Sequence, residues 1–156
     1  MDLHKATRDP WVWGQLALFA LVGLGAPLLP RYAGLGEADP SRIRWLGAPL
    51  IAGGLALAIW GVRSLGRSLT PGTEPLPGAP LVTSGAYAHV RHPIYAGIVL
   101  GLTGYSLAWG SWTLALLVGL LAGAYFNGKA KAEERWLLRR YPTYEAYMRQ
   151  VPRRVL

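Results

Sequence analysis

The stretch PIYAGIVLGLTGYSLAWGSWTLALLVGLLAGAYFNG, residues 93–128, runs for 36 residues without a charged side chain. A membrane-spanning helix needs about 20 apolar residues and at least about 17, so the stretch is too long for one span and sufficient for two short ones. Gly110-Ser111 lies near its middle, where these residue types favour a tight turn. The stretch therefore predicts a membrane hairpin with spans at about 93–109 and 111–128.

Two earlier stretches, 11–29 and 45–62, also contain no ionisable side chain. Gln15 is the only strongly polar residue in the first of them, and Pro27 and Pro49 are expected to kink or end their helices. Hydrophobic residues make up 52% of the 156 residues and charged residues 15%, which is typical of membrane proteins. We therefore expect a single all-α integral membrane domain with about four transmembrane helices.

The net charge of +8 is distributed unevenly about these spans. Thirteen basic residues lie on the side shared by both termini and the central loop: Lys5, Arg8, Arg63, Arg67, Arg91, Lys129, Lys131, Arg135, Arg139, Arg140, Arg149, Arg153 and Arg154. The other side has Arg31, Arg42 and Arg44. This bias predicts cytoplasmic termini in a membrane of the bacterial inner-membrane type. The first apolar run is too long for a typical signal peptide and no clear small-residue cleavage site follows it, so we expect an uncleaved first span. Contact with anionic membrane lipids explains the basic charge, and nucleic-acid binding gains no support from it.

Two polar segments lie on the predicted cytoplasmic side. The loop at 70–92 contains four prolines, which disfavour regular helix, and its second half is apolar and aromatic. We expect this loop to fold back against the ends of the spans. The segment 129–156 has apolar residues at helical intervals, which predicts a C-terminal amphipathic helix that Pro142 divides into two pieces.

Candidate chemistry gathers at the same boundary. In AYAHVRHPIYAG, residues 86–97, Pro93 suits the first position of a helix, so Arg91, His92 and Tyr95 would surround a helix N-terminus that favours an anionic group. Taken alone, these residues favour a membrane-boundary marker over a binding site. A metal site would draw on His89, His92, Glu133 and Glu134, but Pro93 places the two histidines before the helix, and we expect no metal.

Two further sequence features contribute candidate site residues at this boundary. Glu133-Glu134 follows the fourth span, with Lys129 one helical turn earlier on the same face. The loop sequence PLVTSGAYA, residues 80–88, places Tyr87 where its ring could stack on a heterocycle, and no glycine-rich phosphate-binding pattern is present.

Taken together, these motifs resemble the isoprenylcysteine carboxyl methyltransferase family, which is related to the phospholipid N-methyltransferases. The matching pieces are Leu81–Tyr87 (LVTSGAY), Arg91–Gly97 (RHPIYAG), Glu133-Glu134 and Tyr144–Pro152. They occur in the family's order at fitting spacing, over about residues 70–154. The first two spans match only in being hydrophobic.

The resemblance implies a methyltransferase that uses S-adenosylmethionine and acts on a lipophilic small molecule or lipid acceptor. By resemblance, the cofactor site would be lined by Pro80, Leu81, Val82, Tyr87, His92, Pro93, Ile94, Tyr95 and Glu133. Lys129, Arg91 and Glu134 would be the catalytic residues. His89 receives no role.

The chain departs from the family pattern where the family has an arginine four residues before the first glutamate, because Lys129 stands there. Lysine is a point charge without the bidentate fork of arginine, which leaves a carboxylate and an amine acceptor both open. One residue is also missing near Tyr141-Pro142 relative to the family. Two alternative functions are a membrane reductase of the sterol-reductase type and a non-catalytic membrane scaffold.

Overall fold

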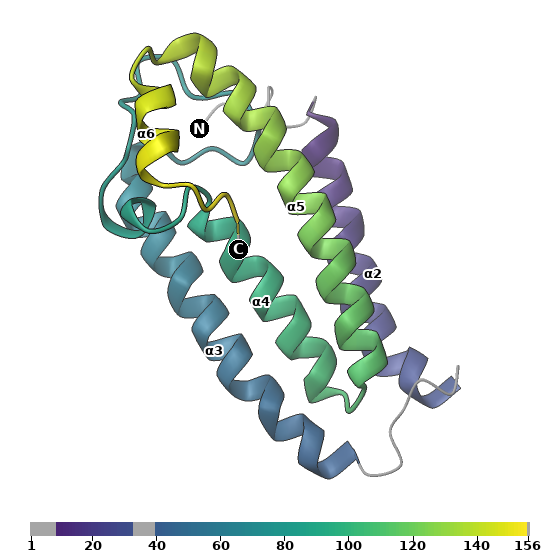
Figure 1. Ribbon diagram of the computed structural model, residues 1–156. Coiled ribbons are helices and arrows are strands. Elements are labelled where there is room, and N and C mark those ends of the chain that lie inside the picture. The colour runs from purple at the N-terminus through teal and green to yellow at the C-terminus, as the bar shows by residue number, and fades with distance from the viewer. Residues whose placement is uncertain (1–8, 33–39, 156) are drawn as a thin grey trace.

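The computed structural model describes residues 9–32 and 40–155, and every regular element in these ranges is helical, as predicted. The main helices are α2 (Pro10–Tyr32), α3 (Pro40–Leu65), α4 (Pro93–Ala108), α5 (Trp112–Arg140) and α6 (Tyr144–Gln150). Two short 3-10 turns, η1 (Gly66–Ser68) and η2 (Gly85–Ala88), lie between α3 and α4. The four long helices run alternately up and down, which brings the start of α4 and the end of α5 to one end of the bundle (Figure 1). Lys5 and Arg8, counted above, lie outside the described residues.

The bundle has an apolar outer surface typical of a membrane protein. Among the described residues, α2, α3 and α5 are each long and apolar enough to cross a membrane, whereas α4 has 16 residues. Large exposed apolar side chains cover the outer faces of the long helices: Leu16, Leu21, Leu24, Leu28, Leu46, Leu55, Ile59, Leu116, Leu117, Leu120 and Leu121. Because soluble monomers rarely expose so much contiguous apolar surface, this is a lipid-facing surface. The protein is therefore an integral membrane protein, and a count of four spans stays a prediction.

The helices begin where the sequence provides capping groups. The Asp9 carboxylate accepts from the backbone N–H of Trp11 at 2.9 Å at the start of α2, and the Ser111 hydroxyl accepts from Leu114 at 3.0 Å at the start of α5. Gly110 has φ +83° and forms the predicted tight turn of the hairpin. Of the two expected outcomes for Pro27 and Pro49, a kink or a helix end, the second does not occur, because both lie inside α2 and α3. Prolines are tolerated inside membrane helices because neighbouring groups satisfy the freed carbonyls.

Helices α3 and α4 pack through glycines spaced seven residues apart. A Cβ added at Gly54 would meet the carbonyl oxygen of Gly97 at 2.5 Å, and one added at Gly104 would meet that of Gly47 at 2.8 Å. Such small residues allow backbones to approach closely in lipid, where packing replaces the hydrophobic effect. The main core lies between α2, α4 and α5 and includes Leu18, Val22, Val99, Leu114, Val118, Ala122 and Phe126.

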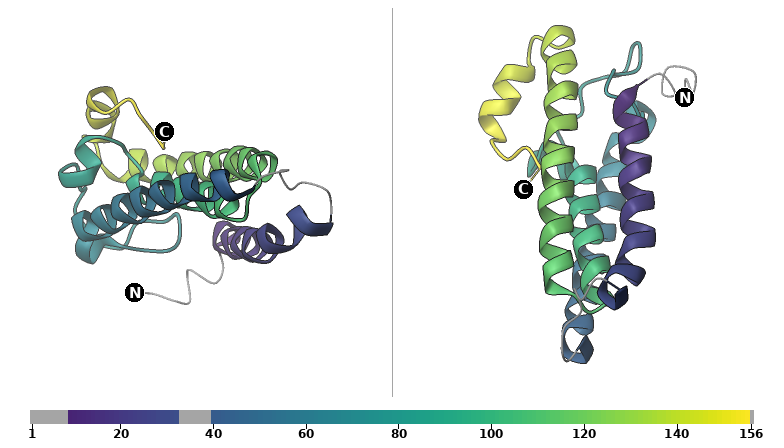
Figure 2. Two further views of the ribbon diagram at one scale, coloured as in Figure 1. Left: turned by 90° about the horizontal axis from the view of Figure 1, so that it is seen from below. Right: turned by 90° about the vertical axis from the view of Figure 1, so that its right-hand side faces the viewer.

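The C-terminal segment folds back onto the end of the bundle. Helix α5 continues unbroken from the apolar hairpin to Arg140, and Pro142 separates it from α6, as predicted. The chain beyond α6 then returns to the start of α4 (Figure 2, right), where backbone N–H groups of Arg91 and His92 donate to the carbonyls of Arg153 and Arg154 at 2.9 Å each. The segment therefore contributes to the interior at this end of the bundle and does not lie as a separate surface helix.

Candidate functional site

Two adjoining cavities lie at the end of the bundle where α4 begins. The first, which we call the α4 cavity, has a volume of 270 Å³ and is lined by Gln15, Leu65, Leu69, Thr70, Pro71, Tyr87, His92, Ile94, Tyr95, Ile98, Lys129 and Glu133. The second, the loop cavity, has a volume of 70 Å³ and lies between the 70–92 loop and the tail. Its lining includes Pro80, Leu81, Val82, Arg91, Leu137, Tyr141, Tyr144 and Tyr147. Tyr87, His92 and Glu133 line both, so the two cavities form one region.

A larger depression of 590 Å³ lies elsewhere, between the start of α2, the loop and the last turns of α5. It is lined by Asp9, Glu74, Arg135 and Arg139, among others, and includes none of the predicted site residues. Although it is larger, this depression is therefore not the candidate site.

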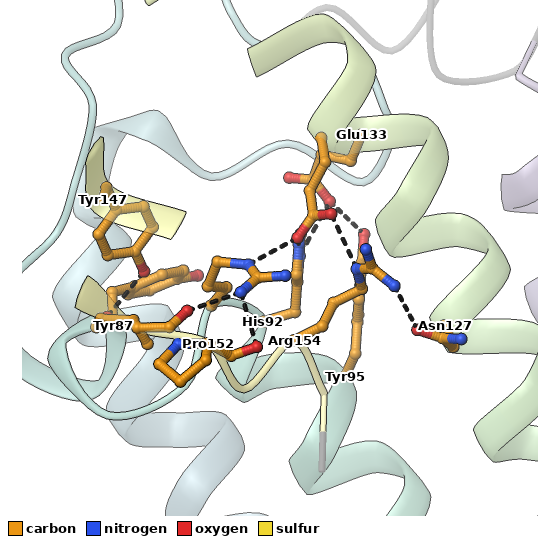
Figure 3. Close-up of polar contacts among 11 residues, drawn as sticks. Tyr87, His92, Tyr95, Asn127, Glu133, Tyr147, Pro152 and Arg154 are labelled. Atoms are coloured by element: carbon orange, nitrogen blue, oxygen red, sulfur yellow. Dashed lines mark hydrogen bonds and ion pairs between the residues drawn. The ribbon is translucent and has the colours of Figure 1, made fainter. Parts of the chain in front are cut away.

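His92, Tyr95 and Glu133 form the polar centre of the α4 cavity (Figure 3). The Tyr95 hydroxyl donates to Oε2 of Glu133 at 2.8 Å, and Nδ1 of His92 lies 3.5 Å from the same oxygen. The imidazole stacks on the Tyr95 ring with 5.3 Å between centroids and 2° between planes. Because His92 precedes α4 and Pro93 begins it, His92 and Tyr95 lie at the N-terminus of α4, where Glu133 of α5 contacts them.

The charge state of His92 depends on two opposing effects. Burial by itself lowers the pKa of the imidazole, but the Glu133 and Glu134 carboxylates stabilise the imidazolium, and the net pKa lies above 6.5. Nε2 of His92 is buried and makes no hydrogen bond within the described part of the chain, although it lies 3.4 Å from Glu134. His92 is therefore a buried group that keeps one hydrogen-bonding position unused.

Arg91 and Glu134 are used in binding the tail. Nε of Arg91 donates to Oε1 of Glu134 at 2.8 Å, and Nη1 donates to the carbonyls of Val151 and Pro152 at 2.6 and 2.8 Å. The second carboxylate oxygen of Glu134 accepts from Nε of Arg154 at 2.8 Å. Arg91 is 6% exposed and Glu134 is 3% exposed. This network fixes the tail to α4 and α5.

Lys129 has different surroundings. Its ammonium donates to Oε1 of Gln15 at 2.7 Å and to the carbonyl of Pro71 at 3.1 Å, and it lies 5.5 Å from the centre of the Tyr95 ring. The residue is 1% exposed and lines the α4 cavity. Lys129 is thus a buried side chain whose hydrogen bonds go to neutral oxygens.

Aromatic residues of the loop and α6 complete the loop cavity. The Tyr147 hydroxyl donates to the Tyr87 carbonyl at 2.7 Å, and burial raises the pKa of Tyr147 to about 12. The Tyr141 hydroxyl donates to the Ala79 carbonyl at 2.6 Å. Gly85 has φ +62° and lies against Ser64 of α3, whose hydroxyl accepts from the Ala86 N–H at 3.2 Å. These bonds hold Tyr87 at the boundary between the two cavities.

The structure brings most of the predicted residues together. Eight of the nine predicted cofactor residues line one or both cavities, while Pro93 packs against Gly61 of α3 and lines neither. Of the three residues predicted to be catalytic, Lys129 lines the α4 cavity, Arg91 lines the loop cavity, and Glu134 lies behind them. No three His, Asp or Glu side chains in the described residues are grouped to hold a metal ion.

Several lining residues were missed from the sequence. Leu65, Leu69, Thr70 and Pro71 come from the end of α3 and the start of the loop, where nothing in the sequence marks them as site residues. Gln15 could have been found, because it is the one strongly polar residue in its span.

Comparison with known proteins gives a family match and several similar proteins. Residues 43–144 match the phospholipid methyltransferase family profile. A protein-S-isoprenylcysteine O-methyltransferase of Schizosaccharomyces pombe is 36% identical over 73 residues, which are 46% of this chain and 31% of that protein. The nickel-cobalt-cadmium resistance protein NccN of Alcaligenes xylosoxydans xylosoxydans is 32% identical over 72 residues, 46% of this chain and 34% of that protein.

The chain therefore spans about a third of the length of the curated relatives it matches. The family profile, however, covers more than half of the chain, including the α3–α4–α5 unit and both Glu133 and Glu134. This protein belongs to the phospholipid methyltransferase family.

Proposed function

We propose that the protein is a membrane methyltransferase that uses S-adenosylmethionine and methylates a lipophilic acceptor. The observation that carries the proposal is the placement of Tyr87, His92, Tyr95 and Glu133 around one cavity region at the end of an apolar bundle. The family match supports methyl transfer, and the isoprenylcysteine methyltransferase relative supports a lipid-linked acceptor.

The residues present fit the chemistry of this cofactor. Its ammonium group suits the carboxylate of Glu133, whose side chain is 24% exposed and lines both cavities. Its carboxylate suits the imidazolium of His92 and the N-terminus of α4. Its adenine suits the aromatic and apolar loop residues around Tyr87. The two cavities, of 270 and 70 Å³, together lie just above the lower end of the roughly 300–1,000 Å³ typical of small-molecule sites.

When bound, S-adenosylmethionine supplies an electrophilic methyl group on a sulfonium sulfur. The residues of this chain would orient the two reactants and exclude water from the space between them. Arg91 and Glu134 would act indirectly, by holding the tail that closes the loop cavity. Lys129 would face the acceptor, because it lines the α4 cavity on the side of the apolar helices.

An apolar groove supports entry of the acceptor from the bilayer. It has a volume of 360 Å³ and is lined by Phe19, Ile51, Gly54, Leu55, Ala58, Gly97, Ile98, Gly101, Leu102 and Tyr105. Ile98 lines both this groove and the α4 cavity, so the groove leads to the candidate site. The charge bias of the sequence supports an orientation with the site at the cytoplasmic face of a bacterial-type inner membrane.

The proposal is tested by calorimetric titration of the detergent-solubilised protein with S-adenosylhomocysteine, the demethylated product. We expect saturable binding that Glu133→Gln weakens by about tenfold or more, because a charge-assisted hydrogen bond contributes about 1.5–3 kcal/mol. Glu145→Gln is the matched control, since that side chain is 73% exposed on α6 and pairs with Arg149. Absence of binding to the wild-type protein, or equal effects of the two variants, would overturn the proposal.

A further inference from the structure

We propose that the 590 Å³ depression is the entrance through which the cofactor reaches its site from water, and that the intervening loop segment is a gate held shut by Asp9 and Thr73. The inference rests on the proposed S-adenosylmethionine site and adds to it a path and a closing contact. The gate comprises residues 69–77, which we call the flap. Asp9 lies directly before α2, outside residues 43–144 that match the family profile.

The first argument is that the flap separates the depression from the two cavities. Thr70 lines all three spaces, and Pro75 lines the depression and the loop cavity. Of these three spaces, Pro71 lines the α4 cavity alone and Thr73 lines the depression alone. The flap therefore has the candidate site on one side and the depression on the other, and its displacement would join them.

The second argument is the polarity of the two routes to the site. S-adenosylmethionine carries an ammonium and a carboxylate group, and moving such groups through an apolar groove is costly. The groove between α2, α3 and α4 therefore suits the acceptor and not the cofactor. The depression is lined by Asp9 and Glu74 and by Arg135 and Arg139, so it presents both signs of charge. This lining suits a ligand that itself carries both signs.

The third argument is the contact that holds the flap. The backbone N–H of Thr73 donates to Oδ2 of Asp9 at 2.7 Å, and the Thr73 hydroxyl donates to the same oxygen at 2.9 Å. Hydrogen bonds to a carboxylate are stronger than those between neutral groups. On the cavity side, the Pro71 carbonyl accepts from Lys129 at 3.1 Å. These contacts hold the middle of the flap across the end of the bundle (Figure 1).

The fourth argument is the construction of the two ends of the flap. Oγ of Ser68 lies 3.5 Å from the carbonyl oxygen of Pro80, so the ends lie side by side, as in an Ω-loop. Gly66 and Gly78 have φ of +54° and +74°, values that favour glycine, and a Cβ added at either would meet nothing within 4 Å. The flap is thus attached at a narrow base, about which it can turn once its middle is released.

The first experiment measures the association and dissociation rates of radiolabelled S-adenosylhomocysteine with the detergent-solubilised protein. We expect Thr73→Val to raise both rates by about tenfold, because a hydrogen bond to a charged group contributes enough for a change of this order. The Kd should stay within about twofold of the wild-type value, since Thr73 lines neither cavity and a gate slows entry and exit alike.

Thr103→Val is the matched control, because it makes the same chemical change elsewhere. The Thr103 hydroxyl donates to the Val99 carbonyl at 2.8 Å within α4, and Thr103 lines neither the depression nor either cavity. Both rates should stay at their wild-type values in this variant. Thermal unfolding of the two variants shows that they are folded.

The second experiment locks the flap. A Cβ added at Gly72 would lie 4.0 Å from Cβ of Asp9, within the range of about 3.5–4.5 Å that a disulfide requires. The chain contains no cysteine, so the double variant Asp9→Cys/Gly72→Cys can form one crosslink, which loss of thiol labelling confirms. We expect the oxidised protein to release bound S-adenosylhomocysteine at least about tenfold more slowly than the same protein after reduction, because a closed gate blocks exit. Asp9→Cys alone should not respond to oxidation.

The outcomes distinguish this inference from the proposed function. If S-adenosylhomocysteine binds but Thr73→Val leaves both rates unchanged, or the oxidised double variant exchanges ligand as fast as the reduced one, the gate is refuted while the methyltransferase proposal stands. A rise in the dissociation rate alone would make the flap part of the binding site, and failure of the two cysteines to crosslink would contradict the closed contact. Either result also refutes the gate. If the wild type binds no S-adenosylhomocysteine, both proposals fail together.

Discussion

His92 illustrates how single residues at this site combine structural and chemical roles. It is 6% exposed, stacks on Tyr95 and lies within 3.5 Å of both Glu133 and Glu134. Two adjacent carboxylates at a membrane boundary would repel each other, and the imidazolium between them reduces this repulsion. The residue therefore links the polar centre of the α4 cavity to the network that holds the tail.

This arrangement predicts a pH-dependent stability. Because the folded-state pKa of His92 is raised above the ordinary 6.5, protonated His92 stabilises the fold fully below pH 6.5, and this contribution is lost as the pH rises through the raised pKa. We expect the melting temperature in detergent, followed by tryptophan fluorescence, to fall as the pH is raised from 6.5. In His92→Gln the melting temperature should be lower at pH 6.5 and should fall less with pH. Parallel pH profiles for the two proteins would contradict the prediction.

At the scale of the elements, the closest packing in the bundle is between α3 and α4. Gly54 is buried against the backbone of Gly97, whereas its neighbour Gly53 is exposed and has open space where a Cβ would lie. This contact matters for the site because α4 begins directly after His92 and carries Tyr95 in its first turn and Ile98 about one turn further along. A shift of α4 relative to α3 would move all three.

Two adjacent alanine substitutions test this packing. Gly54→Ala places a methyl group against backbone atoms that cannot move aside, and overpacking of this kind costs about 1–3 kcal/mol. Gly53→Ala should be neutral or slightly stabilising, because alanine is the better helix former by about 1 kcal/mol. Thermal unfolding of both variants in the same detergent is the measurement. A Gly54→Ala protein as stable as Gly53→Ala would show that α3 and α4 are not packed this closely.

At the scale of the whole molecule, the last residues of the described chain complete the site. Arg154 donates to Glu134 and, at 3.1 Å, to Oδ1 of Asn127 on α5, so it fixes the tail across two turns of that helix (Figure 3). Val155 is buried in the main core. The tail is thus held by a backbone pairing, an ion pair and an apolar contact.

Arg154→Ala should leave one oxygen of the buried Glu134 without its donor and lower the free energy of unfolding by about 1–3 kcal/mol. It should also weaken S-adenosylhomocysteine binding, since Arg91 and the loop cavity depend on the tail. Arg153→Ala is the matched control: its side chain is exposed, and surface substitutions usually change stability by no more than about 0.5 kcal/mol. The two variants are compared by calorimetric titration with S-adenosylhomocysteine and by thermal unfolding. Equal behaviour of the two variants would mean that Arg154 does not hold the tail.

The sequence predicted the helical class, the hairpin turn at Gly110-Ser111 and ten of the residues that line the two cavities. Long uncharged stretches determine where helices form and a glycine-serine pair determines where the chain turns. Both effects depend on neighbouring residues, so the sequence is enough to predict them. The contacts of Gln15 with Lys129 and of Arg154 with Glu134 could not be predicted. They join residues far apart in the chain and depend on how the helices and the tail pack. For Pro27 and Pro49 the sequence left open whether they kink or end their helices, because proline is tolerated within membrane helices.

The backbone pairing of Arg91 and His92 with Arg153 and Arg154 has a consequence for biosynthesis. All the apolar helices leave the ribosome before these last residues, so a nascent chain can insert in the membrane while its site is still open. Residues 153 and 154 close it only once they have emerged. A chain truncated before residue 153 would therefore keep the apolar helices that insert in the bilayer and would lack the backbone pairing that holds the tail over the two cavities.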